Sequence, residues 1–102
     1  MGRLVGKVAY VLGAAGRGNM GQVIARRFAE EGAVVVVGGR HADELEWLAG
    51  EIGGMAVTCD ITKMEDIKSS VGAIMDAHGK LDIAVNATGL GLLAQFEETT
   101  ED

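Results

Sequence analysis

Four short apolar runs are spaced along the chain and predict four β-strands. Lys7–Leu12 and Ala33–Gly38 are nearly continuous apolar runs without a polar face, which is typical of parallel strands buried on both sides. Met55–Thr58 and Leu81–Asn86 are shorter runs of the same kind. After the second run we expect a turn at Gly38-Gly39-Arg40, because two adjacent glycines usually interrupt regular structure.

Between these runs, apolar residues recur at helical intervals and predict three helices. The first extends from about Asn19 to Glu31, and a short second one ends before Gly53-Gly54. The third ends at Gly79, and Thr62 and Glu65 have the spacing of a capping box at its start. Residues 87–98 show no clear period.

Strand and helix alternate three times before a final strand, which predicts an α/β protein with a doubly wound parallel sheet of the Rossmann type. Right-handed crossovers place the first two helices on one face of the sheet and the third on the other. The expected strand order is 3-2-1-4. A ligand then belongs at the carboxyl ends of strands one and four, where the winding direction changes.

Composition narrows the classes of partner. The chain has 102 residues, 48% of them apolar, a net charge of -6 and no run of Lys or Arg, so we expect one folded unit and no nucleic-acid partner. No apolar run approaches about 18 residues, so we expect no membrane association and a cytoplasmic location. Cys59 is the only cysteine and His41 and His78 have no companion at ligand spacing, so no disulfide and no metal site are predicted.

Glycine is the unusual residue, with 16 of 102, and several glycines lie between the first strand and the first helix. A loop without bulky side chains allows backbone N–H groups to approach a pyrophosphate at a helix N-terminus. Gly16-x-Gly18-x-x-Gly21 matches the dinucleotide-binding pattern, although a flexible strand-to-helix turn would need similar residues. The candidate phosphate-binding residues are Gly13, Gly16, Arg17, Gly18, Asn19, Met20 and Gly21.

The sequence resembles the short-chain dehydrogenase/reductase family in four places: this loop, the sequence of the helix that follows it, Asp60 and the segment Asn86-Ala-Thr-Gly89. Gly13 precedes Gly21 by eight positions where the usual family motif has six, so the loop carries two extra residues. Asn19 and Gly21 stand where a divergent branch that includes the enoyl reductases has Ser and Ala. The resemblance therefore implies an oxidoreductase but leaves reduction of a C=O or a C=C bond open.

The end of the second strand indicates the cofactor. An NAD enzyme of this kind places an acid there for the adenosine ribose, whereas NADP requires room and positive charge for its 2′-phosphate. This chain has Gly39 followed by Arg40, and Arg17 could supply a second cation. We therefore predict NADP in preference to NAD, the alternative being that both arginines are ordinary surface residues.

The resemblance also implies roles for residues after the third and fourth strands. Asp60 corresponds to the family's acid that meets the adenine amino group, with Ile61 flanking the ring, but an Asp turn before Thr62 is an equally good local explanation. Asn86 and Ala87 correspond to backbone that passes beneath the adenosine ribose.

The family's catalytic Ser and Tyr-x-x-x-Lys have no counterpart in this sequence, so no catalytic residue is predicted. Residues 1–102 are expected to be the N-terminal half of a single NAD(P)-binding domain and to be inactive alone. We expect the full-length protein to be an NADP-dependent reductase of a small carbonyl or hydroxyl substrate and a homo-oligomer. Alternatives are an enoyl-thioester reductase, a non-catalytic NADP-binding redox sensor, and an ordinary Rossmann dehydrogenase that uses Gly16, Gly18 and Gly21.

Overall fold

The computed structural model describes residues 2–13, 20–60 and 62–87 of the chain. Strands and helices alternate throughout this part, as the sequence predicts. The elements are β1 (Val8–Leu12), α1 (Met20–Glu30), β2 (Val34–Gly39), α2 (Ala42–Ile52), β3 (Met55–Thr58), α3 (Met64–His78) and β4 (Ile83–Asn86).

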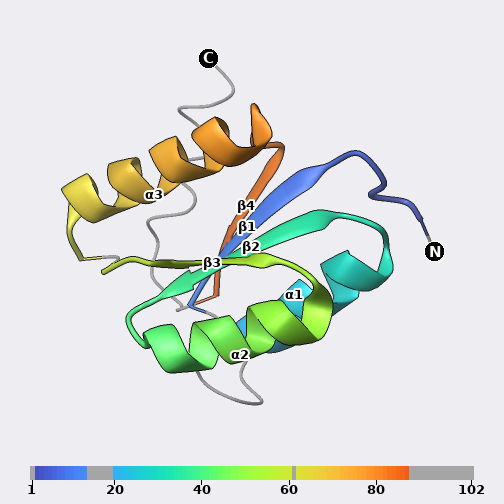
Figure 1. The fold of residues 1–102 in the computed structure, drawn as a ribbon, viewed down its shortest axis with the longest axis horizontal. Coiled ribbons are helices and arrows are strands. Elements are labelled where there is room, and N and C mark those ends of the chain that lie inside the picture. Colours follow the sequence, from blue (N-terminus) through green and yellow to red (C-terminus); the bar gives the residue numbers. More distant parts are fainter. Residues whose placement is uncertain (1, 14–19, 61, 88–102) are drawn as a thin grey trace.

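The four strands form one parallel sheet in the order β3-β2-β1-β4, which confirms the predicted order (Figure 1). From β1 the chain steps outward to β2 and then to β3. It then returns across the sheet and adds β4 on the other side of β1. The winding direction therefore changes between β1 and β4, at the position where ligands bind in open α/β sheets.

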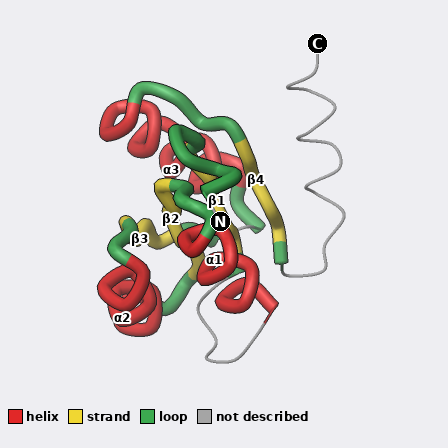
Figure 2. The backbone as a smooth tube through the Cα atoms, turned by 90° about the vertical axis from the view of Figure 1, so that its right-hand side faces the viewer, coloured by secondary structure: helices red, strands yellow, loops and turns green. Residues whose placement is uncertain are grey.

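The helices form a layer on each face of the sheet. Helices α1 and α2 cover one face and α3 covers the other, which confirms the predicted arrangement (Figure 2). Leu45 and Leu48 of α2 are fully buried on the first face, and Ile74 of α3 is fully buried on the second. The molecule therefore has two apolar cores, one on each side of the sheet.

Side chains of the two central strands alternate between these cores. Val11 of β1 and Val37 of β2 pack with α1 and α2, whereas Tyr10 and Val36 pack on the side of α3. All four are at most 1% exposed. Burial of a whole Val side chain stabilises a fold by about 1.5–3 kcal/mol, so both strands have apolar residues at successive positions rather than alternate ones.

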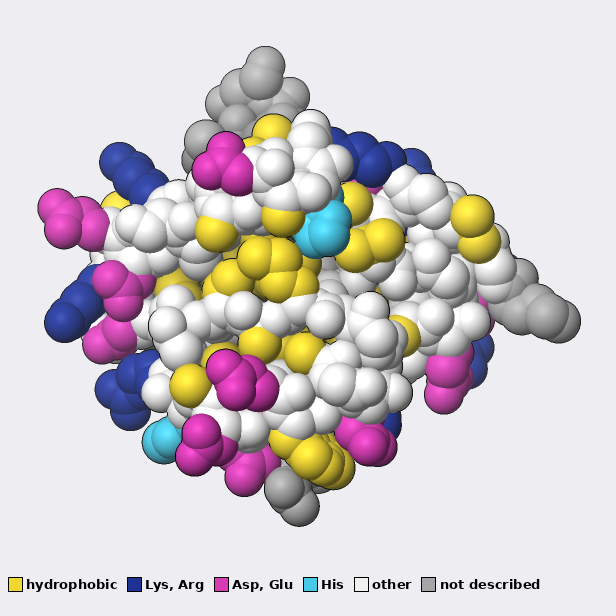
Figure 3. Space-filling view, viewed as in Figure 1, with side chains coloured by type: hydrophobic (Ala, Val, Ile, Leu, Met, Phe, Trp, Pro, Cys, Tyr) yellow, Lys and Arg dark blue, Asp and Glu magenta, His cyan; other side chains and the backbone are white. Residues whose placement is uncertain are grey.

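β3 is less buried than the two central strands. Its side chains are half-buried or exposed, and apolar side chains remain visible between α3 and α2 in the space-filling view (Figure 3). Among the described strands, β3 pairs only with β2. Most of the fully buried side chains of the sheet therefore come from β1 and β2.

Helices α2 and α3 both end at a glycine in the left-handed region. Gly53 has φ 68° and Gly79 has φ 79°, and their N–H groups donate to the carbonyls of Ala49 and Met75. A residue with a side chain would destabilise this conformation by about 1–2 kcal/mol. Glycine at these two positions therefore determines where each helix ends.

Two local predictions are wrong. β2 continues through Gly39 instead of turning from Gly38, because Gly38 pairs with both β1 and β3 and Gly39 pairs with β3. The capping box is not formed, since α3 begins at Met64 with Lys63 as its N-cap residue and no side-chain cap. The Thr62 hydroxyl donates instead to the carboxylate of Asp60 at 2.6 Å. The other strand and helix ends differ from the predictions by a few residues.

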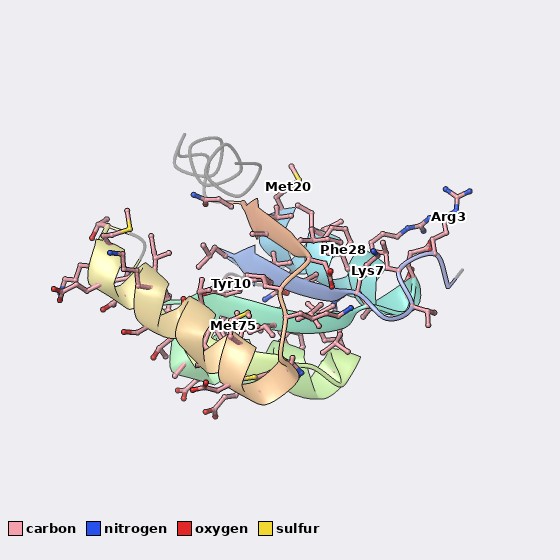
Figure 4. All side chains as sticks on the ribbon, turned by 90° about the horizontal axis from the view of Figure 1, so that it is seen from above. Arg3, Lys7, Tyr10, Met20, Phe28 and Met75 are labelled. Atoms are coloured by element: carbon pink, nitrogen blue, oxygen red, sulfur yellow. The ribbon has the colours of Figure 1, made fainter. Side chains whose placement is uncertain are left out.

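Tyr10 and Gly38 form a close contact between β1 and β2. The Tyr10 side chain extends from β1 on the side of α3 (Figure 4). A Cβ atom at Gly38 would lie 2.7 Å from Cε1 and 2.8 Å from Oη of this tyrosine. Since the ring is 1% exposed, it has little freedom to move away. Gly38 is therefore required by packing.

Asp82 and Lys80 join the beginnings of β1 and β4. The N–H of Val8 donates to Asp82 Oδ2 at 2.8 Å, and Lys80 Nζ lies 3.2 Å from the same oxygen. Lys80 also donates to the carbonyl of Gly6. The hydrogen bond from Val8, followed by the interaction with Lys80, lowers the pKa of Asp82 below its ordinary value of 3.8. The carboxylate is therefore stabilised in its charged form in the folded state.

Gly38→Ala is expected to lower the free energy of unfolding by about 1–3 kcal/mol, the usual cost of overpacking a core. Gly50→Ala in α2 is the matched control, because a Cβ there meets nothing within 4 Å. Removing glycine from a helix interior should stabilise the protein by about 0.5–1 kcal/mol. Denaturant unfolding of both variants measures these changes. A Gly38→Ala variant as stable as the natural protein would contradict the packing argument.

Asp82→Ala is expected to lower the melting temperature at neutral pH, and the difference from the natural protein should shrink on acidification. A carboxyl group whose pKa is lower in the folded state contributes stability above its unfolded pKa and loses it as the pH falls through the folded value. Thermal unfolding between about pH 7 and pH 3 measures the effect. Asp76→Ala on the exposed surface of α3 is the control. A difference that does not depend on pH would contradict this role of the Asp82 charge.

Candidate functional site

The carboxyl ends of the four strands meet at one edge of the sheet, and backbone pairing continues into the segments that follow them. Gly13 N–H donates to the carbonyl of Gly38 at 2.8 Å, and Cys59 N–H donates to that of Gly39 at 2.7 Å. Ala87 N–H donates to the carbonyl of Leu12 at 2.9 Å. The segments after the strands, which contain most of the predicted site residues, therefore start from fixed positions.

The glycine loop begins at this edge and leads to α1. Gly13 has φ 85°, a left-handed conformation that favours glycine. Met20 and Gly21 open α1; Met20 is exposed and Gly21 is buried (Figure 4). The first turn of α1 contains no acidic residue, so no side-chain charge there opposes an anion at the positive end of the helix. The other predicted residues of the loop, Gly16, Arg17, Gly18 and Asn19, lie outside the described residues.

The end of β2 combines a buried glycine with an exposed arginine. Gly39 is the last residue of the strand and is buried, and Arg40 follows it on the surface. No acidic side chain follows the strand until Asp43 in the first turn of α2. Arg40 lies close enough to Asp60 for its charge to contribute to the lowered pKa of that carboxyl group. The ends of β2 and β3 therefore place a cation and an anion at the same edge of the sheet.

Asp60 follows β3 in a turn that its own side chain closes. Asp60 Oδ1 accepts the N–H of Thr62 at 3.0 Å and its hydroxyl at 2.6 Å. The hydroxyl bond, followed by the N–H bond, lowers the pKa of Asp60 below its ordinary value of 3.8. The Asp turn is thus present, and the role of Asp60 toward adenine stays a prediction. Ile61 lies outside the described residues.

Asp66 also belongs to this arrangement, and the sequence interpretation missed it. Its Oδ2 accepts the N–H of Asp60 at 3.0 Å from the first turn of α3. The Asp60-x-Thr62 spacing is a recognisable signal for an Asp turn, but nothing in the sequence indicates a contact between residues 60 and 66. The contact arises because the chain folds back where α3 begins.

The end of β4 lies beside β1 at the change of winding direction. Asn86 is half-buried and is paired in register with Leu12, and Ala87 is held by its bond to the same residue. Gly13 continues from Leu12 on the neighbouring strand. The structure therefore brings Asn86 and Ala87 to the start of the glycine loop, as predicted.

Within residues 2–13, 20–60 and 62–87, no three His, Cys, Asp or Glu side chains are grouped as metal ligands. In the same ranges, no helix has the length and apolar character needed to cross a bilayer.

A parallel sheet with this order and helices on both faces define an α/β fold of the Rossmann type. A family model described as "Enoyl-(Acyl carrier protein) reductase" matches residues 13–102. The chain belongs to the short-chain dehydrogenase/reductase family.

Relatives and solved structures agree with this assignment. The uncharacterized oxidoreductase YuxG of Bacillus subtilis is 39% identical over 101 residues, covering 92% of this chain and 14% of YuxG. A short-chain dehydrogenase from Mycobacterium smegmatis has a TM-score of 0.81 and 37% identity, with 89% of this chain and 39% of that one covered.

Two similar structures contain a nicotinamide cofactor. A 3-ketoacyl-(acyl-carrier-protein) reductase from Brucella melitensis, complexed with NADH, has a TM-score of 0.74 and 41% identity, covering 79% of this chain and 33% of that one. Actinorhodin polyketide ketoreductase with NADPH has a TM-score of 0.75 and 31% identity, covering 82% and 33%. The chain thus spans less than half the length of each of these four relatives, and it shares the fold of the two structures that contain a nicotinamide dinucleotide.

Proposed function

We propose that the full-length protein is an NADP-dependent oxidoreductase that transfers a hydride between nicotinamide and a small carbonyl or hydroxyl substrate. Residues 1–102 supply the cofactor-binding half of its domain, and the catalytic residues belong to the other half. The observation that carries the choice of NADP is the end of β2, where buried Gly39 precedes exposed Arg40.

The charge at this edge favours a phosphate over a bare ribose. An acid after the strand would accept hydrogen bonds from ribose hydroxyls but would repel a 2′-phosphate. Gly39 provides no such acid, and the planar guanidinium of Arg40 can make two charge-assisted bonds to a phosphate. Arg17 in the glycine loop is proposed as a second cation.

We propose that the remaining predicted residues contact the cofactor at its pyrophosphate, its adenosine ribose and its adenine. Gly13 and the loop through Gly21 bind the pyrophosphate with backbone N–H groups at the start of α1. Asp60 and Ile61 contact the adenine. Asn86 and Ala87 lie beneath the adenosine ribose.

Reduction of a carbonyl group is preferred to reduction of a C=C bond. The two cofactor-bound structures are those of a 3-ketoacyl-(acyl-carrier-protein) reductase and a ketoreductase, which share 41% and 31% identity with this chain. The enoyl reductases remain the second candidate, because the matching family model carries their name and the glycine loop is longer than usual.

Gly39→Asp combined with Arg40→Ala is expected to reverse the cofactor preference of the full-length protein from NADPH to NADH. Loss of a charge-assisted phosphate contact should cost about 1.5–3 kcal/mol, roughly ten- to a hundredfold in affinity for NADPH. Fluorescence titration with both cofactors measures the two dissociation constants. Arg27→Ala in the last turn of α1 removes the same charge near the start of β2, at the opposite end of the strand from Arg40, and is the control. Equal affinity of the natural protein for NADPH and NADH would refute the proposed preference.

Residues 1–102 made alone are expected to reduce no carbonyl substrate with NADPH, because the proton-donating Tyr-x-x-x-Lys is missing from this stretch. The isolated stretch should also self-associate, since β4 pairs only with β1 among the described strands and exposes a strand edge. An assay that follows NADPH oxidation by its absorbance tests the first point, and sedimentation tests the second. Both are compared with the full-length protein. Measurable turnover, or a well-dispersed monomer, would contradict the corresponding expectation.

A further inference from the structure

Asp60 is held at its main chain and at its side chain by residues that follow it. Its N–H donates to Asp66 Oδ2 at 3.0 Å, and its carbonyl accepts the N–H of Lys63 at 2.9 Å. Its Oδ1 accepts both the N–H and the hydroxyl of Thr62. Rotation of the carboxylate would break the two bonds to Thr62 together, so the side chain is fixed in one orientation.

This arrangement uses the two carboxylate oxygens of Asp60 differently. Both hydrogen bonds from Thr62 reach Oδ1. Within residues 2–13, 20–60 and 62–87, Oδ2 of Asp60 accepts no hydrogen bond. Asp60 is half-buried and lies after β3 at the edge where the strand ends meet. Oδ2 is therefore left as the acceptor for a further donor.

We propose that Thr62 and Asp66 are positioning residues that select a 6-aminopurine base, by holding Asp60 so that its Oδ2 faces the base. This inference rests on the proposed adenine role of Asp60. Thr62 fixes the carboxylate, and Asp66 fixes the backbone from which that carboxylate extends. Neither residue contacts the base in this arrangement.

The chemistry of the base at C6 explains the selection. An ionised carboxylate only accepts hydrogen bonds, and the lowered pKa of Asp60 keeps it ionised at neutral pH. The amino group of adenine donates to such an acceptor, whereas the 6-oxo group of hypoxanthine would place a second acceptor against it. A carboxylate that is already fixed loses little side-chain freedom when the base binds.

The test compares binding of NADPH and its hypoxanthine analogue to the full-length protein. The two cofactors differ only at the C6–N1 edge of the purine, where the analogue has a 6-oxo group and an N1–H, so the ratio of their dissociation constants isolates recognition of the base from recognition of the phosphates. The natural protein should bind NADPH about tenfold more tightly or better, because the analogue leaves a charged acceptor unpaired. A ratio near one would overturn both the adenine role of Asp60 and the inference that rests on it.

Asp60→Asn tests the adenine role separately. An amide keeps an oxygen that can accept both bonds from Thr62, and its NH2 group then occupies the position of Oδ2. This NH2 donates to a 6-oxo group and opposes a 6-amino group, so the preference should reverse toward the analogue. An unchanged ratio would refute the adenine role.

Thr62→Val tests positioning, because it removes the hydroxyl and keeps both the shape of the side chain and the N–H. The ratio should fall about two- to tenfold, the cost of immobilising one side chain, and Thr62→Ser should restore it. In the Asp60→Asn background, Thr62→Val should weaken the reversal. Asp66→Ala should lower the ratio in the same direction.

Ser69→Ala and Asp76→Ala on the exposed surface of α3 are the matched controls and should leave the ratio unchanged. If Asp60→Asn reverses the preference while Thr62→Val and Asp66→Ala keep the natural ratio, positioning is overturned and the adenine role stands. An equal loss of affinity for both cofactors, at constant ratio, shows a merely structural role and also overturns it. If the ratio of the two dissociation constants is unchanged in only one of the variants Thr62→Val and Asp66→Ala, the residue changed in that variant has no positioning role.

Discussion

The parallel ladder between β1 and β2, buried on both faces, is the constraint on which the rest of the fold depends. Parallel neighbours cannot be joined by a tight turn, so each connection must cross the sheet and contributes a helix. Two buried faces require helices on both sides, and the return of the chain to β4 places α3 opposite α1 and α2. The same return puts Gly13 and Asn86 next to each other, so the position of the candidate site follows from burial of the central strands.

The sequence predicts this architecture because uninterrupted apolar runs and helical stripes are local signals of burial. It misplaces the end of β2 because Gly38 and Gly39 have low intrinsic preference for strands, and their backbone pairing depends on neighbours distant in sequence. Gly38 is needed there to make room for Tyr10, a requirement that appears only when the two strands are placed side by side.

The candidate site is predictable where a residue lies at the end of a strand or within two positions after it. Arg40, Asp60 and Asn86 are found at the common edge because parallel strands carry their following residues to the same side. The contact between Asp60 and Asp66 could not be predicted, since it depends on the path of the chain into α3. The capping-box prediction fails for a related reason. The Thr62 hydroxyl donates to the nearby Asp60 carboxylate, and α3 begins one residue further on, with Lys63 rather than Thr62 as its N-cap residue.

The turn at Asp60 also changes how its two interpretations relate. From the sequence, an Asp turn and contact with adenine are alternative uses of one side chain. In the structure the turn occupies Oδ1 and the backbone N–H of Asp60, and neither group is required by a purine amino group at Oδ2. A carboxylate with two oxygens can therefore close the turn and still present an acceptor. The bonds that close the turn keep that acceptor charged and stationary at the edge where the four strands end.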